Sequence, residues 1–128
     1  MLGLASPGCT TAPPQSGAAA SNVLTPMELI ASIDARRGQT VTVSGYFTYV
    51  TDTRALWQNE AAHREAEQLR KGSWDKCITI YPSSTKAKRF NGMHVQITGK
   101  ATVIDKDDMR SLWTCNQVAL EDAAITLG

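Results

Sequence analysis

The sequence predicts a mainly β fold, a small closed barrel of five strands. Two eight-residue stretches, Gly38–Gly45 and Gly92–Gly99, share one pattern in which two glycines enclose alternating branched apolar and polar residues. Alternation with a period of two is typical of a strand that buries one face, here the face of Val41 and Val43 in the first stretch. The second glycine of each stretch marks a position where the strand bends or bulges. Two bent strands of this kind indicate a barrel.

Length and composition fit one domain. The chain has 128 residues, enough for one domain with a hydrophobic core and too few for two. Lys and Arg number 13 and Asp and Glu number 12, so the formal net charge of +1 gives no strong overall attraction to nucleic acid or anionic membranes. No apolar run approaches the roughly 20 residues of a membrane-spanning helix, which predicts a soluble body.

Residues 1–22 are predicted to be a disordered leader and residues 23–128 the folded domain. Pro, Ser, Gly and Ala dominate the stretch after Cys9 and offer no apolar periodicity that a fold could bury. This stretch is therefore expected to act as a flexible tether.

The leader contains a candidate lipidation site. Gly8 directly before Cys9, together with the linker that follows, resembles the processing site of a bacterial lipoprotein, whose cysteine is acylated. Ser6 and Pro7 depart from the usual residues of that site, and a basic, hydrophobic upstream part is missing. The resemblance implies a lipid anchor on Cys9. The alternative is a cloning or gene-start remnant with an irrelevant cysteine.

The first element of the domain is predicted to be a helix with complete start signals. Thr25 is placed as the N-cap, Pro26 occupies the first helical position, and Glu28 can close a capping box. The helix is expected to end near Arg36 and Arg37, because cations suit the negative end of a helix dipole. These two arginines are interpreted as cap residues.

Apolar alternation and turn residues predict five strands after this helix. A charged segment, Glu60–Lys71, lies between the second and third strands and is predicted to be a surface helix, because its apolar face is thin. The predicted strands are Val41–Val50, Ala55–Gln58, Lys76–Tyr81, Met93–Ile104 and Leu112–Leu120, with a polar loop at Ser83–Asn91 and a closing, packed segment at Ala123–Leu127.

Four segments share residue types with a known barrel fold: Met27–Ile30, Gly38–Phe47, Trp57 and Gly92–Gly99. In this order of elements they resemble the oligonucleotide/oligosaccharide-binding (OB) fold, a five-stranded Greek-key barrel, and in particular small bacterial envelope proteins of that fold. The resemblance covers about residues 25–127 but consists of common residue types. It implies an architecture and no particular ligand.

The three cysteines suit an oxidising compartment. Cys77 and Cys115 lie in the predicted domain and Cys9 in the leader, which indicates one disulfide and one separate thiol. The alternative is that Cys77 and Cys115 are small buried hydrophobic residues. Because the third and fifth strands are neighbours in the OB fold, the resemblance implies that these two cysteines come within bonding reach. A bond there would close a loop of about 39 residues and stabilise by roughly 4 kcal/mol.

The spacing of polar residues predicts no catalytic residue, no metal site and no cofactor. His63 and His94 are far apart, lack a cysteine pair nearby and are interpreted as surface residues. Asp105, Asp107 and Asp108 imitate part of a calcium loop but lack its glycine and distant glutamate, so they are interpreted as a solvated turn. No serine or cysteine has the base and orienting acid that nucleophilic catalysis needs.

Aromatic and basic residues give a candidate binding surface, since OB barrels often present such residues on their second and third strands and nearby loops. The aromatic rings could stack on bases and the cations could contact phosphates. The alternative is that the rings pack in or over the barrel and the cations lie in a solvated loop. The residues concerned are Tyr46, Trp57, Tyr81, Lys86, Lys88 and Arg89.

The sequence therefore predicts a non-enzymatic, OB-like barrel on the periplasmic side of the bacterial envelope, anchored through a lipid on Cys9. The expected partner is a protein or a peptidoglycan-type component of the cell wall, and an inhibitor or immunity role against a secreted toxin is one form of this. Membrane contact is expected through the lipid alone. A single-stranded nucleic-acid-binding domain is the alternative, although the aspartates of the last loop oppose it, and an enzyme ranks last.

Overall fold

The structure is a computed structural model that describes residues 22–51, 53–69, 74–105, 107 and 115–128. The predictions for residues 1–21, including Cys9, for Asp108, for the end of the charged helix (70–71) and for the start of the fifth strand (112–114) lie outside these residues. Among the described residues, no helix is long and apolar enough to cross a membrane.

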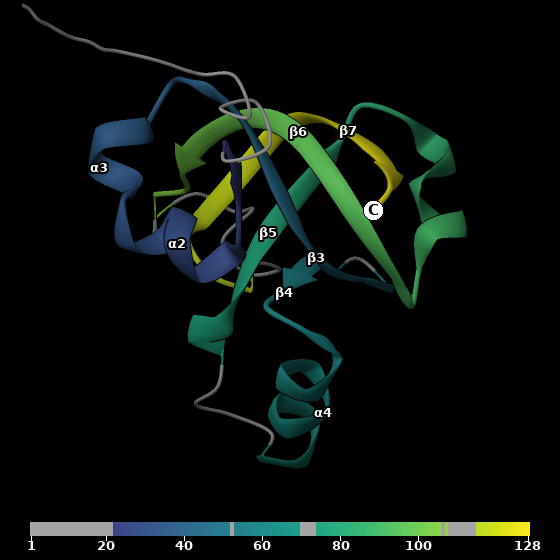
Figure 1. The fold of residues 1–128 in the computed structure, drawn as a ribbon. Coiled ribbons are helices and arrows are strands. Elements are labelled where there is room, and N and C mark those ends of the chain that lie inside the picture. The colour runs from purple at the N-terminus through teal and green to yellow at the C-terminus, as the bar shows by residue number, and fades with distance from the viewer. Residues whose placement is uncertain (1–21, 52, 70–73, 106, 108–114) are drawn as a thin grey trace, which may run out of the picture.

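Five strands within the described ranges close into a barrel, which confirms the mainly β fold (Figure 1). Each strand is hydrogen-bonded to two neighbours in the order β3-β4-β5-β7-β6 and back to β3. Among these five strands, the pairings are antiparallel except that of β5 with β7, which is parallel. The strands are β3 (Thr40–Val50), β4 (Thr53–Trp57), β5 (Cys77–Pro82), β6 (Met93–Val103) and β7 (Val118–Leu127).

This order puts the third barrel strand beside the fifth and closes the first on the fourth, so the barrel is compatible with an OB-like fold. A short strand, β2 (Val23–Leu24), runs parallel to the first half of β3, beyond the reach of the shorter β4. The start of the domain therefore completes the sheet where β4 has ended.

The predicted N-terminal helix consists of two short helices, α2 (Pro26–Ala31) and α3 (Ile33–Arg36). The capping box is present, because the Glu28 amide donates to Thr25 Oγ1 (3.2 Å) and the Thr25 amide donates to Glu28 Oε1 (2.8 Å). Between the helices, the Ser32 hydroxyl donates to the Glu28 carbonyl at 2.7 Å, and Ser32 leaves the helical region of backbone conformation. Serine bonded back in this way bends helices, which explains the break.

The position of the fifth strand corrects the sequence-based prediction of Leu112–Leu120. β7 begins at Val118 and continues to Leu127, so the segment Ala123–Leu127 is part of the strand and does not merely pack beside it. Three consecutive buried residues, 118–120, interrupt the alternation on which the prediction depended. The register of β7 against β6 also shifts, between Thr98 and Lys100 of β6, where Gly99 lies. Two β7 residues, Asp122 and Ala123, lie opposite Gly99 alone, so the extra residue of this bulge is on β7, facing the second glycine of the later stretch, and not on the glycine strand itself.

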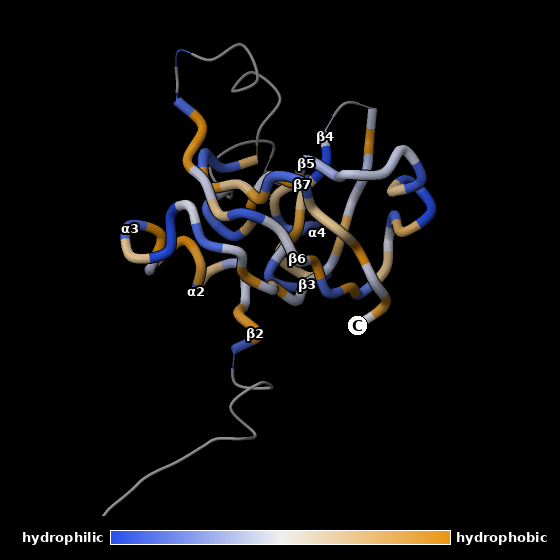
Figure 2. The backbone as a smooth tube through the Cα atoms, turned by 90° about the horizontal axis from the view of Figure 1, so that it is seen from above, coloured by the Kyte–Doolittle hydropathy of each residue, from blue (hydrophilic) through white to orange (hydrophobic). Residues whose placement is uncertain are grey.

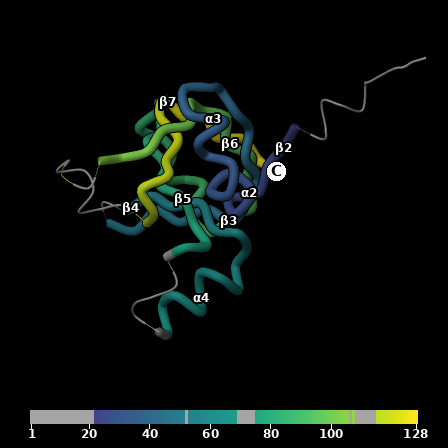
Figure 3. Tube along the Cα trace, turned by 90° about the vertical axis from the view of Figure 1, so that its left-hand side faces the viewer, coloured from purple at the N-terminus to yellow at the C-terminus, as the bar shows by residue number. Residues whose placement is uncertain are grey.

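Between the barrel strands, the described residues form three further helices. The predicted surface helix is present as α4 (Glu60–Leu69), which projects from one side of the barrel in both Figure 1 and Figure 3. A 3₁₀ turn, η1 (Trp74–Lys76), leads into β5. The predicted polar loop contains a 3₁₀ helix, η2 (Thr85–Phe90), because Ala87 is buried and Phe90 packs on the core.

The barrel interior holds the main hydrophobic core. Its side chains come from every barrel strand and from α2, which lies across one end. In Figure 2 hydrophobic stretches concentrate on the strands, whereas the η2 segment on the right is largely hydrophilic. Among the largest fully buried side chains are Leu29, Phe47, Leu56, Ile78, Ile80, Ile97 and Leu120.

Candidate functional site

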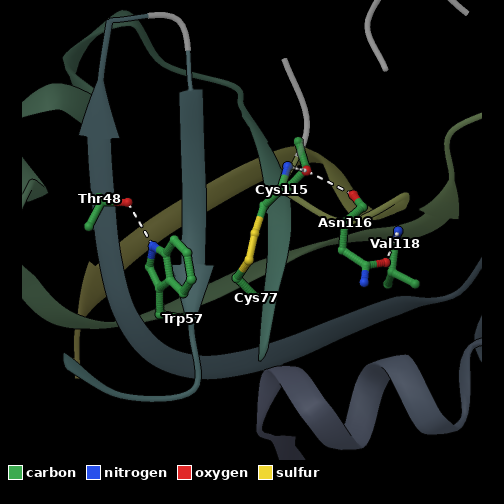
Figure 4. Close-up of a disulfide and its surroundings, with 7 residues drawn as sticks. Thr48, Trp57, Cys77, Cys115, Asn116 and Val118 are labelled. Atoms are coloured by element: carbon green, nitrogen blue, oxygen red, sulfur yellow. Dashed lines mark hydrogen bonds between the residues drawn. A yellow bond between two sulfur atoms is a disulfide. The ribbon is translucent and has the colours of Figure 1, made fainter. Parts of the chain in front are cut away.

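A second, smaller hydrophobic layer lies on the outer face of β4 and β5. Trp57 is 2% exposed and packs with Ala62 and Ala66 of α4. Its indole Nε1–H donates to the hydroxyl of Thr48, itself buried on β3, at 2.9 Å (Figure 4). The helix α4 therefore covers the indole on one side, and the hydrogen bond to Thr48 satisfies its buried N–H.

The same layer contains the disulfide between Cys77 and Cys115, which the number and placement of the cysteines and the resemblance to the OB fold had suggested (Figure 4). The Cα atoms are 6.1 Å apart, within the normal range for a disulfide. Thr79 supports the bridge, because its hydroxyl accepts from the Cys115 amide (2.8 Å) and donates to the Asn116 carbonyl (2.9 Å). The bond thus joins the start of β5 to the segment that enters β7.

Replacing Trp57 with Phe is expected to lower the free energy of unfolding by about 2 kcal/mol. The change removes the indole donor from a buried Thr48 hydroxyl and leaves a small void. Denaturant unfolding of the two proteins measures the difference. A double variant, Trp57→Phe with Thr48→Val, removes both partners and should cost less than the sum of the single changes. Simple additivity would contradict the hydrogen bond as the cause.

Histidine and tyrosine rings extend the outer layer toward solvent. His63 was interpreted as a surface residue, yet only 17% of its side chain is exposed, because its ring lies 5.1 Å from Trp57 and 5.8 Å from Tyr46. Tyr46 also contacts His94 across the strand pair, with ring centroids 5.6 Å apart. In the described part of the chain, no group of three or more His, Cys, Asp or Glu residues could hold a metal ion.

A groove of about 270 Å³ runs between α4 and the β3–β4 hairpin, next to these rings. Its walls include Trp57, His63 and Val50, a large apolar side chain that is 57% exposed. The groove is more apolar than polar, and Glu67 lies at its rim. It could accept a small apolar group, but nothing on its walls selects one.

Two adjoining clefts lie at the end of the barrel between the β3–β4 hairpin and η2. The larger, about 290 Å³, is lined by Arg54, Tyr49 and Tyr81. The smaller, about 180 Å³, is lined by Lys86, Arg89 and Phe90 among others. The segment from Pro82 to Ser84 lines both clefts and separates the two groups of side chains.

The structure therefore divides the candidate binding residues between two places. Tyr46 and Trp57 belong to the outer layer, and Trp57 is too buried to stack on a ligand, in accord with the packing interpretation of its ring. The other four, at the barrel end, are Tyr81 and the η2 residues Lys86, Lys88 and Arg89, of which the last three are exposed.

Sequence reasoning missed two residues of the larger cleft, Tyr49 and Arg54. They face each other across the β3–β4 hairpin, and the Arg54 guanidinium carbon lies 5.1 Å from the centre of the Tyr49 ring. The signal was available, because a hairpin around Thr51 pairs residues at equal distance from the turn. Only the fold, however, brings this pair next to η2.

Fold and clefts together define a class of protein: a disulfide-linked, closed five-stranded barrel, compatible with an OB-like fold, with cations grouped at one end. A scan against protein-family models found no match for the chain. Searches of curated proteins and of solved structures found none either. The functional argument therefore depends on the residues themselves.

Proposed function

We propose that this protein is a non-enzymatic binding module of the bacterial cell envelope, exported and held to the membrane by a lipid on Cys9. The observation that carries the proposal is the disulfide between Cys77 and Cys115. Such bonds persist in the periplasm and are rare in the reducing cytosol. The Gly8–Cys9 pair and the Pro/Ser/Gly/Ala-rich segment after it add support, since they are the arrangement of a lipidation site followed by a spacer.

The partner in this proposal is a protein or a component of the cell wall. OB barrels commonly bind extended ligands on the outer face of their second and third strands. Here those strands are β4 and β5, and their outer face carries the buried Trp57, the disulfide and the alanines of α4. A partner is therefore expected at the barrel end with the two clefts, where polar and charged side chains are accessible.

A single-stranded nucleic-acid binder is the second candidate, favoured by the three exposed cations of η2. Binding of single strands normally combines such cations with aromatic rings on which bases stack. Trp57 is buried, and the Tyr46 ring is flanked by the two histidines. The envelope module therefore has the better support.

The proposal is tested by the intact mass and location of the protein made in its native host. We expect the protein in the membrane fraction, with an acylated Cys9 and oxidised Cys77 and Cys115. A Cys9→Ser variant should keep the disulfide and leave the membrane fraction. An unmodified Cys9 together with free thiols at Cys77 and Cys115 would disprove the envelope assignment.

Nucleic-acid binding is tested separately by titrating the full chain with a single-stranded oligonucleotide and recording tryptophan fluorescence at low and high salt. The envelope module predicts no salt-sensitive quenching. Strong quenching at low salt that weakens at high salt would favour the second candidate instead.

A further inference from the structure

Two arginines at the cleft end of the barrel are stacked on aromatic rings. The Arg54 guanidinium carbon lies 5.1 Å from the centre of the Tyr49 ring, and that of Arg89 lies 5.0 Å from the centre of the Phe90 ring. Stacking restricts a guanidinium to one plane and leaves its edge, with the N–H donors, open to a second group. Both side chains are thus arranged to receive an acceptor.

Neither arginine has an ion-pair partner among the described residues, and neither do Lys86 and Lys88. The three ion pairs in that part of the chain join His63, Arg64 and Lys76 to glutamates on α4. Glu121 and Asp122 precede Ala123 on β7, but they do not line either cleft. The chain has a net charge of only +1, so these four cations at one end of the barrel form a local positive surface.

Hydrogen bonds connect the two segments that carry the stacked arginines. The Tyr49 amide donates to Asn91 Oδ1 at 2.8 Å, and the Gly92 amide donates to the Phe47 carbonyl at 2.8 Å. These bonds tie the residues directly after η2 to the part of β3 on which Arg54 stacks. Phe90 in turn packs against the barrel core. The chain segments that carry the two arginines are therefore tied to the barrel and to each other.

The ridge between the two clefts is also fixed, and it adds hydroxyl groups. Ser83 donates to the Ala123 carbonyl through its amide (2.9 Å) and its hydroxyl (3.2 Å). The Ser84 hydroxyl accepts from the Lys86 amide at 3.1 Å. Arg54 lines the cleft on one side of this ridge, and Lys86 and Arg89 line the cleft on the other side.

Planar N–H donors next to hydroxyls fit carboxylates, which accept two parallel hydrogen bonds from one arginine. We propose that this end of the barrel, defined by Arg54, Lys86, Lys88 and Arg89, binds an acidic segment of a partner protein. Aspartate or glutamate side chains enter the two clefts and pair with Arg54 and Arg89. The inference rests on the proposed function, because it specifies the chemistry of the partner of that binding module.

A nucleic-acid strand fits this surface less well than an acidic peptide. The rings of Tyr49 and Phe90 are each covered on one face by an arginine, and both are partly buried against the core. Phosphates could contact the cations, but the faces of these two rings that the arginines cover are closed to bases. The carboxylates of aspartate and glutamate side chains, in contrast, can reach the arginines through the clefts and require no exposed ring.

The test measures binding of a fluorescent octa-glutamate peptide to the full oxidised chain by anisotropy at low salt. The double variant Arg54→Gln/Arg89→Gln should bind at least about tenfold more weakly. The control Arg37→Gln/Arg64→Gln removes the same charge from α4 and from the end of α3, and it should change affinity by less than about twofold. Unfolding midpoints must match the wild type in both variants.

Three results would overturn the inference: no binding of the peptide by the wild type, equal weakening in the control variant, or tighter binding of an eight-nucleotide single strand than of the peptide. If any of these occurs while the native protein has an acylated Cys9 and an oxidised Cys77–Cys115 pair, only the acidic-partner inference fails. If the peptide binds but the native protein has an unmodified Cys9 and free thiols at Cys77 and Cys115, the acidic-peptide site is supported and the envelope assignment is disproved.

Discussion

Breaking the disulfide between Cys77 and Cys115 is expected to lower the free energy of unfolding by about 4 kcal/mol. The two cysteines are 38 positions apart, so the bond removes much of the freedom of the unfolded chain. It also joins the start of β5 to the segment that enters β7, the two strands that form the parallel pair of the barrel. Guanidinium unfolding of the oxidised protein with and without a reductant measures the change.

Two variants separate the disulfide from other effects of the reductant. Cys77→Ala/Cys115→Ala should unfold at the lower midpoint of the reduced protein, and reductant should shift it no further. Cys9→Ser should behave like the wild type in both conditions, since Cys9 is not part of the bond. Equal midpoints for the oxidised and reduced wild type would show that the bond contributes nothing to stability.

Local patterns were sufficient to predict the barrel. Val41, Val43, Val95 and Ile97 alternate with polar residues, and their side chains do fill the interior. Thr25 with Glu28 predicted the start of α2, because a capping box involves residues three apart. The disulfide followed from cysteine number together with the expected neighbours of the third strand. The first two features depend on residues that are close together in the sequence, and the disulfide depends on the strand order of the OB fold.

Features set by tertiary contacts escaped prediction. The alternation that marks a strand fails at Val118–Leu120, where all three side chains are buried, so the last strand was placed too early. His63 has the sequence context of a surface helix, but the rings of Trp57 and Tyr46 pack against it in the folded barrel. The grouping of Arg54 with Arg89 depends on the hairpin and η2 meeting at one end of the barrel.

The closing glycine of the first glycine stretch is expected to be the least tolerant position of β3. Gly45 lies in the interior-facing row with Val43 and Phe47, at the point where β3 is paired with β6 and begins to pair with β4. A Cβ at this position would overlap the backbone carbonyl oxygen of Trp57 and lie 3.0 Å from Leu56 Cγ. Backbone on one side and core on the other leave no direction in which the methyl group can move.

Gly45→Ala should therefore lower the free energy of unfolding by about 3 kcal/mol, measured by denaturant unfolding of the oxidised protein. Gly38→Ala is the matched control from the other end of the same stretch. Its Cβ would meet nothing within 4 Å, and its cost of about 1 kcal/mol comes from the positive φ of 84° alone. Equal losses for the two variants would contradict the close approach of β3 and β4 at Gly45. A larger loss at Gly45 would assign its role to steric space inside the barrel, and that of Gly38 to the turn that precedes β3.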